Sequence, residues 1–294
     1  MGTGGWSYFK VRGDKLYRYS RCFNFVEVNT TFYIHPSPNT VRHWRSRVPD
    51  SFVFSVKCHR SVSHRHRLRP TVQAIRDFEK SLDVGRLLHA SVMVLQTPAI
   101  LPLTGEMIHG FLRCVDTGDI RLALEARGPI STDALNALER YDVIHIVDLS
   151  KETPSYVGEI LYSRLLGSGE HNIYQFDDNE LREIRRKAEN TPARKVFLSF
   201  HGLKMYLDAA RMKSYLEMDV IPRTTSGIGL DSLREVVAED VVFPTTRDEL
   251  LSSIGWKLVE LPDGRQVRAI TMLTQIEDRL YRDLDDLISS LRIV

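Results

Sequence analysis

Residues 52–57, Phe-Val-Phe-Ser-Val-Lys, form a short apolar segment that ends in a charged residue. The pattern recurs along residues 1–216, where the polar residues that end or interrupt similar segments are Glu27, Asn29, Gln96, Glu125, Asp148, Arg164 and His201. Continuous runs of Val, Ile, Leu and Phe are typical of parallel strands that are covered on both faces. The segment therefore predicts one strand of a repeated strand and helix arrangement.

Eight segments are expected to form strands: residues 2–5, 25–28, 52–57, 91–96, 120–125, 143–148, 160–165 and 196–200. Helices with start signals are expected between them, over residues 40–48, 72–89, 132–141 and 180–188. The alternative is an open doubly wound sheet, but eight units without a glycine-rich phosphate loop favour an α/β fold of the TIM-like (β/α)8 barrel type. In such a barrel the active site lies at the carboxyl ends of the strands.

Four polar residues at these strand ends are candidates for catalysis: Glu27, Lys57, Glu125 and Asp148. A carboxylate in an apolar strand is costly without a cationic partner, and Lys57 and Arg164 are the expected partners. A carboxylate beside a lysine can act as general acid or base, and a desolvated Lys57 can form a Schiff base with a sugar aldehyde. The alternative is a purely structural ring of salt bridges inside the barrel.

The segment that follows Lys57 is strongly basic and is expected to bind phosphate. Arginine and lysine clamp phosphate, and histidine can carry a proton near neutral pH. The candidate substrate-binding residues here are His59, Arg60, His64, Arg65 and Arg67, together with Asn29, Gln96, Arg164 and His201 at other strand ends. His64 and His66 form a His-x-His pair that leaves a divalent metal as an alternative, but two ligands without a third are common, so no cofactor is predicted.

Aromatic residues lie beside the basic segments, in or after the first two strands. Rings beside basic residues suit bases or sugars, which they bind by stacking and by cation attraction. Trp6, Tyr8 and Tyr33 follow strand ends and are therefore expected in the substrate pocket. Core packing is the alternative for aromatic residues such as Phe32 and Trp44.

The net charge of +2 conceals an uneven distribution. Residues 1–75 hold thirteen Lys and Arg against three acidic residues, which gives +10, and the rest of the chain carries −8. A local basic region suggests a polyanionic partner, either nucleic acid or a phosphorylated small molecule. The alternative is a solvated basic face on the first helices.

Residues 217–294 depart from the repeated pattern and are expected to form a small separate module after a barrel of residues 1–216. A linker over residues 223–227 is followed by a helix over 245–254, a hairpin of 256–261 with 266–270, and a terminal helix over 276–291. The net charge of −6 in this module argues against binding a phosphate backbone by charge alone. A protein partner is the alternative for this module.

The composition, 43% hydrophobic and 27% charged, is typical of a globular chain. No apolar run approaches the roughly 20 residues that a membrane helix needs, so no membrane association is expected. Residues 1–5 lack the features of a secretory signal, which leads us to expect a cytoplasmic location. Cys22, Cys58 and Cys114 are expected to be free thiols.

Several motifs resemble the YecE-like family, a domain of unknown function. They are Gly-Thr-Gly-Gly-Trp-Ser-Tyr at 2–8, Val-Glu-Val-Asn-Thr-Thr-Phe-Tyr at 26–33, and segments 54–57, 95–98, 122–127 and 164–167. The resemblance covers roughly residues 1–216 and implies a TIM-like barrel with a pocket built from those strand ends. It implies no settled activity, and the similarity of the barrel to sugar isomerases and to an abasic-site endonuclease is an analogy of fold.

Three functions are consistent with these patterns. The first is an enzyme of DNA repair, a DNA-binding hydrolase or lyase (glycosylase, lyase or nuclease type) that acts on damaged DNA with Lys57 and either Glu125 or Asp148. The second is a metabolic isomerase, lyase or hydrolase that acts on a phosphorylated sugar, and the third is a non-catalytic binding protein. The first is preferred because the positive charge of residues 1–75 exceeds what one phosphate needs.

Overall fold

The computed structural model of the 294-residue chain describes residues 1–291. The chain divides into two compact units. Residues 1–165 and 184–201 form the barrel unit, and residues 166–183 with those from 202 onward form the second unit. Within the described residues, no helix is long and apolar enough to cross a membrane.

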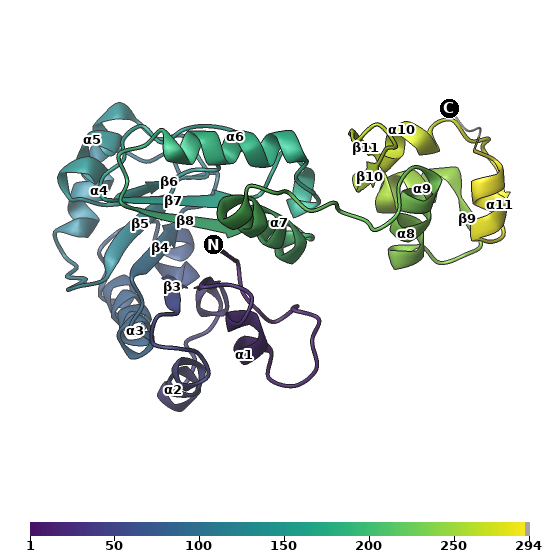
Figure 1. Cartoon of the computed structure of the whole chain (residues 1–294). Coiled ribbons are helices and arrows are strands. Elements are labelled where there is room, and N and C mark those ends of the chain that lie inside the picture. Colours follow the sequence, from purple (N-terminus) through teal and green to yellow (C-terminus); the bar gives the residue numbers. More distant parts are fainter. Residues whose placement is uncertain (292–294) are drawn as a thin grey trace. The chain divides into compact units, whose positions relative to one another are not determined.

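The barrel unit is built on a sheet of eight parallel strands (Figure 1). They are β1 (Gly2–Thr3), β2 (Phe25–Val28), β3 (Val53–Lys57), β4 (Val92–Gln96), β5 (Arg121–Glu125), β6 (Ile144–Ile146), β7 (Ile160–Leu165) and β8 (Lys195–Phe200). Their order in the sheet is β6-β5-β4-β3-β2-β1-β8-β7, and a parallel bridge between Val147 and Ser163 links the two edge strands. The sheet therefore closes into a TIM-like barrel, which confirms the predicted α/β fold class.

Helices alternate with the strands along the barrel unit. They are α1 (Lys15–Ser20), α2 (Pro38–Ser46), α3 (Val72–Leu88), α4 (Gly105–Leu112) and α5 (Thr132–Arg140), with short turns η1 (Thr30–Phe32) and η2 (Ser61–Arg65) after β2 and β3. The side chains of Asp14, Ser37, Thr71, Thr104 and Ser131 accept hydrogen bonds at the starts of the five helices. Capping of this kind satisfies backbone donors that lack a partner within the helix.

The predicted elements of the barrel are present with small shifts at their ends. α2 begins at Pro38 rather than at residue 40, because Ser37 caps it. α1 and α4 are present where no helix was predicted, and both are short. α4 also contains two glycines, Gly105 and Gly110, which weaken the helical signal of its sequence.

Successive strand residues alternate between two hydrophobic clusters. The outer cluster joins Met93 and Leu95 to helix residues such as Phe78. Strands alone contribute the buried members of the inner cluster, which are Phe25, Val92, Val94, Ala123, Ile144, Ile146, Ile160, Tyr162 and Phe197. We call the side chains that point into the barrel the inner row. Because side chains on a strand alternate faces, a residue two positions after a member of the inner cluster also belongs to this row and lies nearer the carboxyl end of its strand.

The second unit holds η3 (Glu170–Asn172), the first half of α6 (Asp178–Glu189), and α7 (Met205–Met218). It continues with α8 (Leu230–Asp240), β9 (Thr245–Thr246), α9 (Arg247–Ile254), β10 (Leu258–Glu260), β11 (Gln266–Arg268), α10 (Ala269–Leu273), β12 (Leu280–Tyr281) and α11 (Leu284–Ser289). β10 and β11 form the predicted antiparallel hairpin. Leu233, Val237, Leu250, Ile254 and Tyr281 belong to a hydrophobic core within this unit.

Arg211 joins separate segments of the second unit. Its fully buried guanidinium donates to the carbonyls of Phe176 and Pro222 and forms an ion pair with Asp178. The carboxylate of Asp208 lies 3.5 Å from it. Burial raises the pKa of Asp208 to about 7 in spite of this arginine.

The predicted continuous helix over residues 276–291 is wrong. Leu280–Tyr281 pairs as a strand with Thr245–Thr246, and only Leu284–Ser289 is helical. Asp283 caps this helix by accepting a hydrogen bond from the backbone N–H of Asp286. The buried ring of Tyr281 needs the core of the second unit, and this tertiary contact outweighs the local helical preference.

Candidate active site

Arg164 is at the centre of a buried charged cluster inside the barrel. It follows Tyr162 by two residues on β7, so its side chain continues the inner row. Its guanidinium forms ion pairs with Glu27 on β2 and Glu125 on β5, and it donates to Gln96 Oε1 on β4 at 3.1 Å. Three predicted substrate-binding or catalytic residues therefore converge on the fourth, Arg164.

Glu27 is completely buried within this cluster. It accepts hydrogen bonds from Tyr162 Oη at 2.8 Å and from Arg164 Nε at 3.2 Å, and Tyr162 Oη also lies 2.8 Å from Ser55 Oγ. Burial alone would raise the pKa of Glu27, but Arg164 and His201 outweigh it and hold that pKa well below the usual range. Glu27 is thus an ionised residue that positions Arg164.

His201 lies directly after β8 and contacts the same arginine. Its two ring nitrogens lie 3.3 Å from Arg164 Nε and Nη2, and Nε2 lies 3.0 Å from Ser199 Oγ. Burial and the charge of Arg164 lower the pKa of His201. The ring is therefore neutral at pH 7 and can accept a hydrogen bond.

Asn29 connects the cluster to the loop that follows β1. Its Nδ2 donates to the carbonyl of Gly4 at 2.7 Å. Its Oδ1 is buried and has no hydrogen-bond partner within residues 1–291. A side chain at Gly4 would meet His201 Nδ1 at 2.3 Å and Asn29 Nδ2 at 2.7 Å, so this close approach requires glycine.

Lys57 ends β3, and only 7% of its surface is exposed. Its Nζ lies 4.0 Å from the centroid of the Phe32 ring and makes no hydrogen bond or ion pair within the described residues. Burial and then the charge of Arg164 lower the pKa of Lys57 from 10.5 to about 7, although Glu27 and Glu125 oppose the shift. The lowered pKa increases the neutral fraction of the amine near pH 7, and the neutral form is the one that attacks a carbonyl.

Glu125 is the more accessible of the two carboxylates that contact Arg164. Its side chain is 10% exposed, against none for Glu27, and Arg127 Nε lies 3.4 Å from its Oε1. Burial raises its pKa, but Arg164, Arg127 and Lys57 together lower it. Glu125 is consequently an ionised carboxylate on the side of the cluster nearer to solvent.

The basic segment after Lys57 forms the π-helical turn η2. Arg60, Arg65 and Arg67 are exposed, and none forms an ion pair within the described residues. His64 packs edge-on against Phe32 at 5.0 Å, and burial and the charge of Lys57 lower its pKa. Three cationic groups near Lys57 are thus available to an anion.

His59 is held in a separate network beside this turn. It stacks on His35 at 4.4 Å, and its Nδ1 lies 3.1 Å from Ser61 Oγ, which donates to Asp77. Its Nε2 lies 3.2 Å from the backbone oxygen of Tyr33. These contacts indicate that His59 positions the turn.

Four predicted site residues have other surroundings. Tyr8 and Tyr33 are 81% and 63% exposed. Trp6 packs against Trp44 at 5.3 Å, in a second cavity that is described below. Asp148 accepts hydrogen bonds from Ser150 N and Oγ and lies 4.0 Å from Lys151 Nζ.

No metal centre is formed by the part of the chain that the structure describes: no three His, Cys, Asp or Glu side chains there have a suitable arrangement. His64 Nδ1 lies 3.0 Å from Ser63 Oγ, and His66 Nδ1 lies 3.1 Å from Thr71 Oγ1. Cys22, Cys58 and Cys114 are free thiols. Burial raises the pKa of Cys58 to about 12, so this thiol is unreactive near neutral pH.

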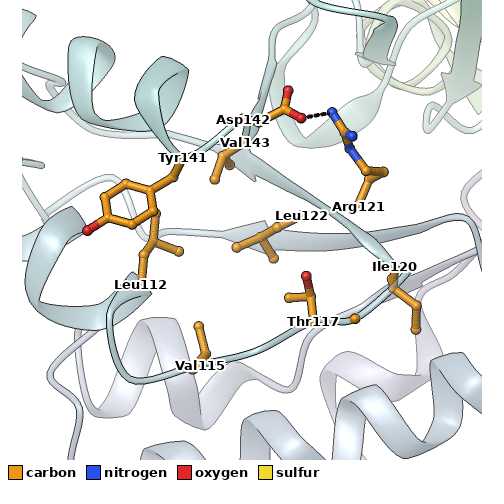
Figure 2. Close-up of a pocket in the computed structure, with 10 residues that line it drawn as sticks. Leu112, Val115, Thr117, Ile120, Arg121, Leu122, Tyr141, Asp142 and Val143 are labelled. Atoms are coloured by element: carbon orange, nitrogen blue, oxygen red, sulfur yellow. Dashed lines mark ion pairs between the residues drawn. The ribbon is translucent and has the colours of Figure 1, made fainter.

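Figure 2 shows a cavity of about 240 Å³ at the other end of the barrel. Arg121, the first residue of β5, forms an ion pair with Asp142 at its edge. The remaining walls are mainly apolar and include Leu112, Val115 and Leu122. Conserved chemistry of TIM barrels is concentrated at the opposite, carboxyl ends of the strands, so this cavity is not the candidate active site.

Tyr162, Phe32 and Arg127 contact the cluster but were not among the predicted site residues. Tyr162 lies two positions before Arg164, and Arg127 lies two positions after Glu125. Counting in twos from a strand-end residue would have indicated both. The contact of the Phe32 ring with the Nζ of Lys57 has no comparable signal in the sequence.

The fold and the cluster define a TIM-like barrel protein with a lysine and a carboxylate–arginine cluster at the carboxyl ends of its strands. A family model described as "Protein of unknown function DUF72" matches residues 1–226, so the chain belongs to the DUF72 family. This membership agrees with the resemblance of its motifs to YecE-like proteins.

One curated relative is UPF0759 protein YecE of Escherichia coli K12, which is 40% identical over 81 residues. That match covers 26% of this chain and only 30% of the length of the relative. A DUF72 family protein of Enterococcus faecalis V583 superposes with a TM-score of 0.57 at 16% identity, covering 73% of this chain and 95% of that one. A DUF72 family protein of Thermotoga maritima MSB8 gives 0.57 at 17% identity, covering 74% and 98%. These two similarities establish the fold.

Proposed function

We propose that the protein is a lyase that acts on damaged nucleic acid, with Lys57 as the nucleophile that attacks the aldehyde of an abasic sugar. The observation that carries this proposal is the buried amine of Lys57, whose pKa is about 7 and whose nitrogen has no hydrogen-bond partner in the described residues. A structural lysine at such a depth is normally paired with a carboxylate. Lys57 combines burial with an unused nitrogen, which is the arrangement that an amine nucleophile needs.

The reaction follows from this arrangement. The neutral amine of Lys57 attacks the C1 aldehyde of the ring-opened deoxyribose, and loss of one water with uptake of one proton from solvent gives an iminium ion. Glu125 removes a proton from C2, the C2–H electron pair forms a C2=C3 double bond, and the C3–O bond breaks so that the 3′ phosphate leaves with the bonding pair. One water then hydrolyses the imine and restores the Lys57 amine.

Charge favours nucleic acid over a small substrate. Arg60, Arg65 and Arg67 lie in and beside the turn that follows Lys57, are exposed, and form no ion pair within residues 1–291. Several free cations suit a strand with a phosphate on each side of the reacting sugar. Among the glycosylase, lyase and nuclease chemistries considered for this site, the lyase makes the most direct use of Lys57.

Borohydride trapping tests the proposal. The protein is incubated with an oligonucleotide that carries one abasic site, and sodium borohydride reduces the iminium ion to a stable amine. We expect a covalent adduct on a denaturing gel, and we expect Lys57→Met and Lys57→Arg to abolish it. Lys195→Met is the matched control, because Lys195 is an exposed lysine at the start of β8.

Two results would overturn the assignment: no adduct and no strand cleavage with the intact protein, or an adduct that persists in Lys57→Met. Binding of the oligonucleotide without turnover would instead favour the non-catalytic binding protein. Mass spectrometry of the trapped peptide identifies the lysine that reacted.

A phosphorylated sugar is the second candidate. His64 and Arg127 lie near Lys57, since the charge of Arg127 lowers the pKa of both Lys57 and His64 and the charge of Lys57 lowers that of His64. This grouping favours a phosphorylated sugar, because one phosphate and one carbonyl would satisfy these residues. Trapping with a panel of aldose and ketose phosphates tests this function. An adduct with a sugar phosphate, together with intact oligonucleotide, would select it over the nucleic acid.

A further inference from the structure

A second cavity of about 430 Å³ lies on the barrel unit, apart from the charged cluster. It is lined by Trp6, Asp14, Lys15, His43, Trp44 and Arg47, among others. These residues come from the loop after β1, from the start of α1 and from the end of α2. The volume falls within the range of about 300–1,000 Å³ that is usual for small-ligand sites.

Two indole rings form one part of the wall. Trp6 and Trp44 are half-buried and meet edge to face, with ring centroids 5.3 Å apart and planes at 83°. Neither indole N–H has an acceptor within residues 1–291, whereas Trp256 in the second unit donates to the carbonyl of Ser253 at 2.9 Å. Each indole N–H is therefore unused within the described residues and can donate to a ligand acceptor.

The other part of the wall is cationic. Arg47 uses its Nε for an ion pair with Asp14, and its two terminal nitrogens have no partner in the described residues. The ammonium of Lys15 donates to the carbonyl of Ser7 at 2.6 Å and remains exposed. The cavity therefore presents aromatic rings and positive charge together, which is the combination that binds a base and its phosphate.

The surroundings of the cavity extend this charge. Five further basic residues on or next to the same loop and the same two helices are exposed and form no ion pair within residues 1–291. They are Lys10, Arg12, Arg18, Arg21 and Arg42. One bound nucleotide needs one or two cations, but a strand carries a phosphate at every step. Charge complementarity thus favours a strand over a free nucleotide.

The loop that carries Trp6 is also fixed to the candidate active site. Gly4, two residues before Trp6, accepts a hydrogen bond from Asn29 and donates to the carbonyl of Phe200. Both partners are at strand ends of the barrel. The loop that carries Trp6 is therefore joined through Gly4 to the strand ends on which the candidate active site lies.

We propose that this cavity binds one base of a single strand of nucleic acid, which stacks on one of the indoles of Trp6 and Trp44 and meets the other edge-on, with the adjacent phosphate on Lys15 and Arg47. The inference takes its class of partner from the function proposed above. It adds a place that holds undamaged sequence of the same strand. Binding here requires no aldehyde and no chemistry at Lys57.

Intrinsic fluorescence provides a direct test, because the chain contains three tryptophans and two of them line the cavity. In a Trp256→Phe background, only Trp6 and Trp44 emit. We expect an oligothymidylate of about ten nucleotides to quench this emission. We expect Trp6→Ala or Trp44→Ala to raise the Kd, measured by anisotropy of a labelled oligonucleotide, about 5- to 100-fold.

Three further variants protect the test against misfolding. Trp6→Phe and Trp44→Phe keep a ring at each position and should weaken binding less than the alanine variants do. Arg47→Gln leaves both rings in place and should reduce the slope of log Kd against log salt by about one phosphate contact. Circular dichroism confirms the fold of each variant.

Absence of quenching, or an unchanged Kd in both alanine variants, would overturn the inference. Thymidine monophosphate that binds as tightly as the oligomer would overturn the strand as partner. Lys57→Met should retain quenching while it loses trapping, so failure of the lyase and failure of this cavity are separately visible.

Discussion

Lys57 and Phe32 form a cation–π contact in which the ammonium nitrogen lies 4.0 Å from the ring centroid. The ring favours the charged form of lysine only modestly, by about 1–2 kcal/mol in a desolvated site. Burial and Arg164 disfavour that form more strongly, and the pKa of Lys57 falls to about 7. The contact thus keeps the amine in place without holding its proton.

Lys57→Met is expected to stabilise the protein while it removes the proposed nucleophile. Because the pKa of Lys57 is lower in the folded chain than its value of 10.5 in the unfolded chain, protonated Lys57 opposes folding. This penalty is complete below pH 7 and disappears as the pH rises toward 10.5. At pH 6 we expect the free energy of unfolding to rise by about 1 kcal/mol or more, which raises Tm by about 2–4 °C.

Thermal unfolding at pH 6 and pH 10 measures this effect. The difference between Lys57→Met and the unmodified protein should shrink at the higher pH. The exposed Lys195→Met control should show no such trend. A lower Tm for Lys57→Met at pH 6 would contradict the assignment of an unfavourable buried charge.

The rate of borohydride trapping should depend on the ionisation of Lys57. Only the neutral amine attacks, so the rate should rise about tenfold per pH unit below pH 7 and level off above it. Glu125→Gln removes a charge that raises the pKa of Lys57 and leaves Arg164 less neutralised. The midpoint should therefore move to lower pH. An upward shift, or a midpoint near 10.5, would refute this coupling.

Arg164→Met should destabilise the barrel strongly. It leaves Glu27 and Glu125 buried without their cation, and loss of one partner from a buried pair costs about 3–5 kcal/mol. Glu27→Gln combined with Arg164→Met should cost less than the sum of the two single variants, because the glutamine leaves no buried charge at position 27. Urea unfolding of the four proteins measures the coupling, and simple additivity would contradict it.

The same cluster should make the barrel sensitive to acid. The pKa of Glu27 and that of Glu125 are lower in the folded chain than in the unfolded chain. Their contribution to stability is therefore present above pH 4.5 and is lost as the pH falls below that value. Urea unfolding at pH 4 and pH 6 should show this loss, and Arg164→Met should reduce it.

Gly4→Ala should disturb the contact between the β1 loop and the active site. The added Cβ would lie 2.3 Å from His201 Nδ1 and 2.7 Å from Asn29 Nδ2, so both side chains must move. We expect a loss of about 1–3 kcal/mol in urea unfolding. Gly110→Ala is the matched control, because its Cβ meets nothing within 4 Å and alanine favours the helix α4. Equal effects at the two positions would contradict the role of Gly4.

Strand positions and the convergence of strand-end residues could be predicted from the sequence because both depend on local patterns. Apolar runs indicated the eight strands, and parallel pairing placed Glu27, Gln96, Glu125 and Arg164 at the same end of the barrel. The assignment of partners could not be predicted in the same way. Glu27 and Tyr162 are 135 residues apart, and their contact depends on how the barrel closes.

Side chains on loops after the strands were harder to place. Trp6 follows a strand end, as the pattern indicated, but its ring lies against Trp44 in a separate cavity. The direction of a loop side chain is determined by neighbouring helices rather than by the alternation of a strand. The exposure of Tyr8 and Tyr33 could not be predicted for the same reason, because both side chains follow strand ends rather than lying within a strand.

The second unit is discontinuous, since residues 166–183 and those from 202 onward belong to it while residues 184–201 return to the barrel unit. The barrel segment of residues 184–201, which holds the second half of α6 and β8, is consequently preceded and followed in the chain by the second unit. Closing such a loop before β8 enters the sheet reduces the chain entropy that remains to be lost. Truncation after residue 216 would remove Pro222 from the buried guanidinium of Arg211. Insertion of β8 into the sheet is thus tied by chain connectivity to the two segments of the second unit that flank it.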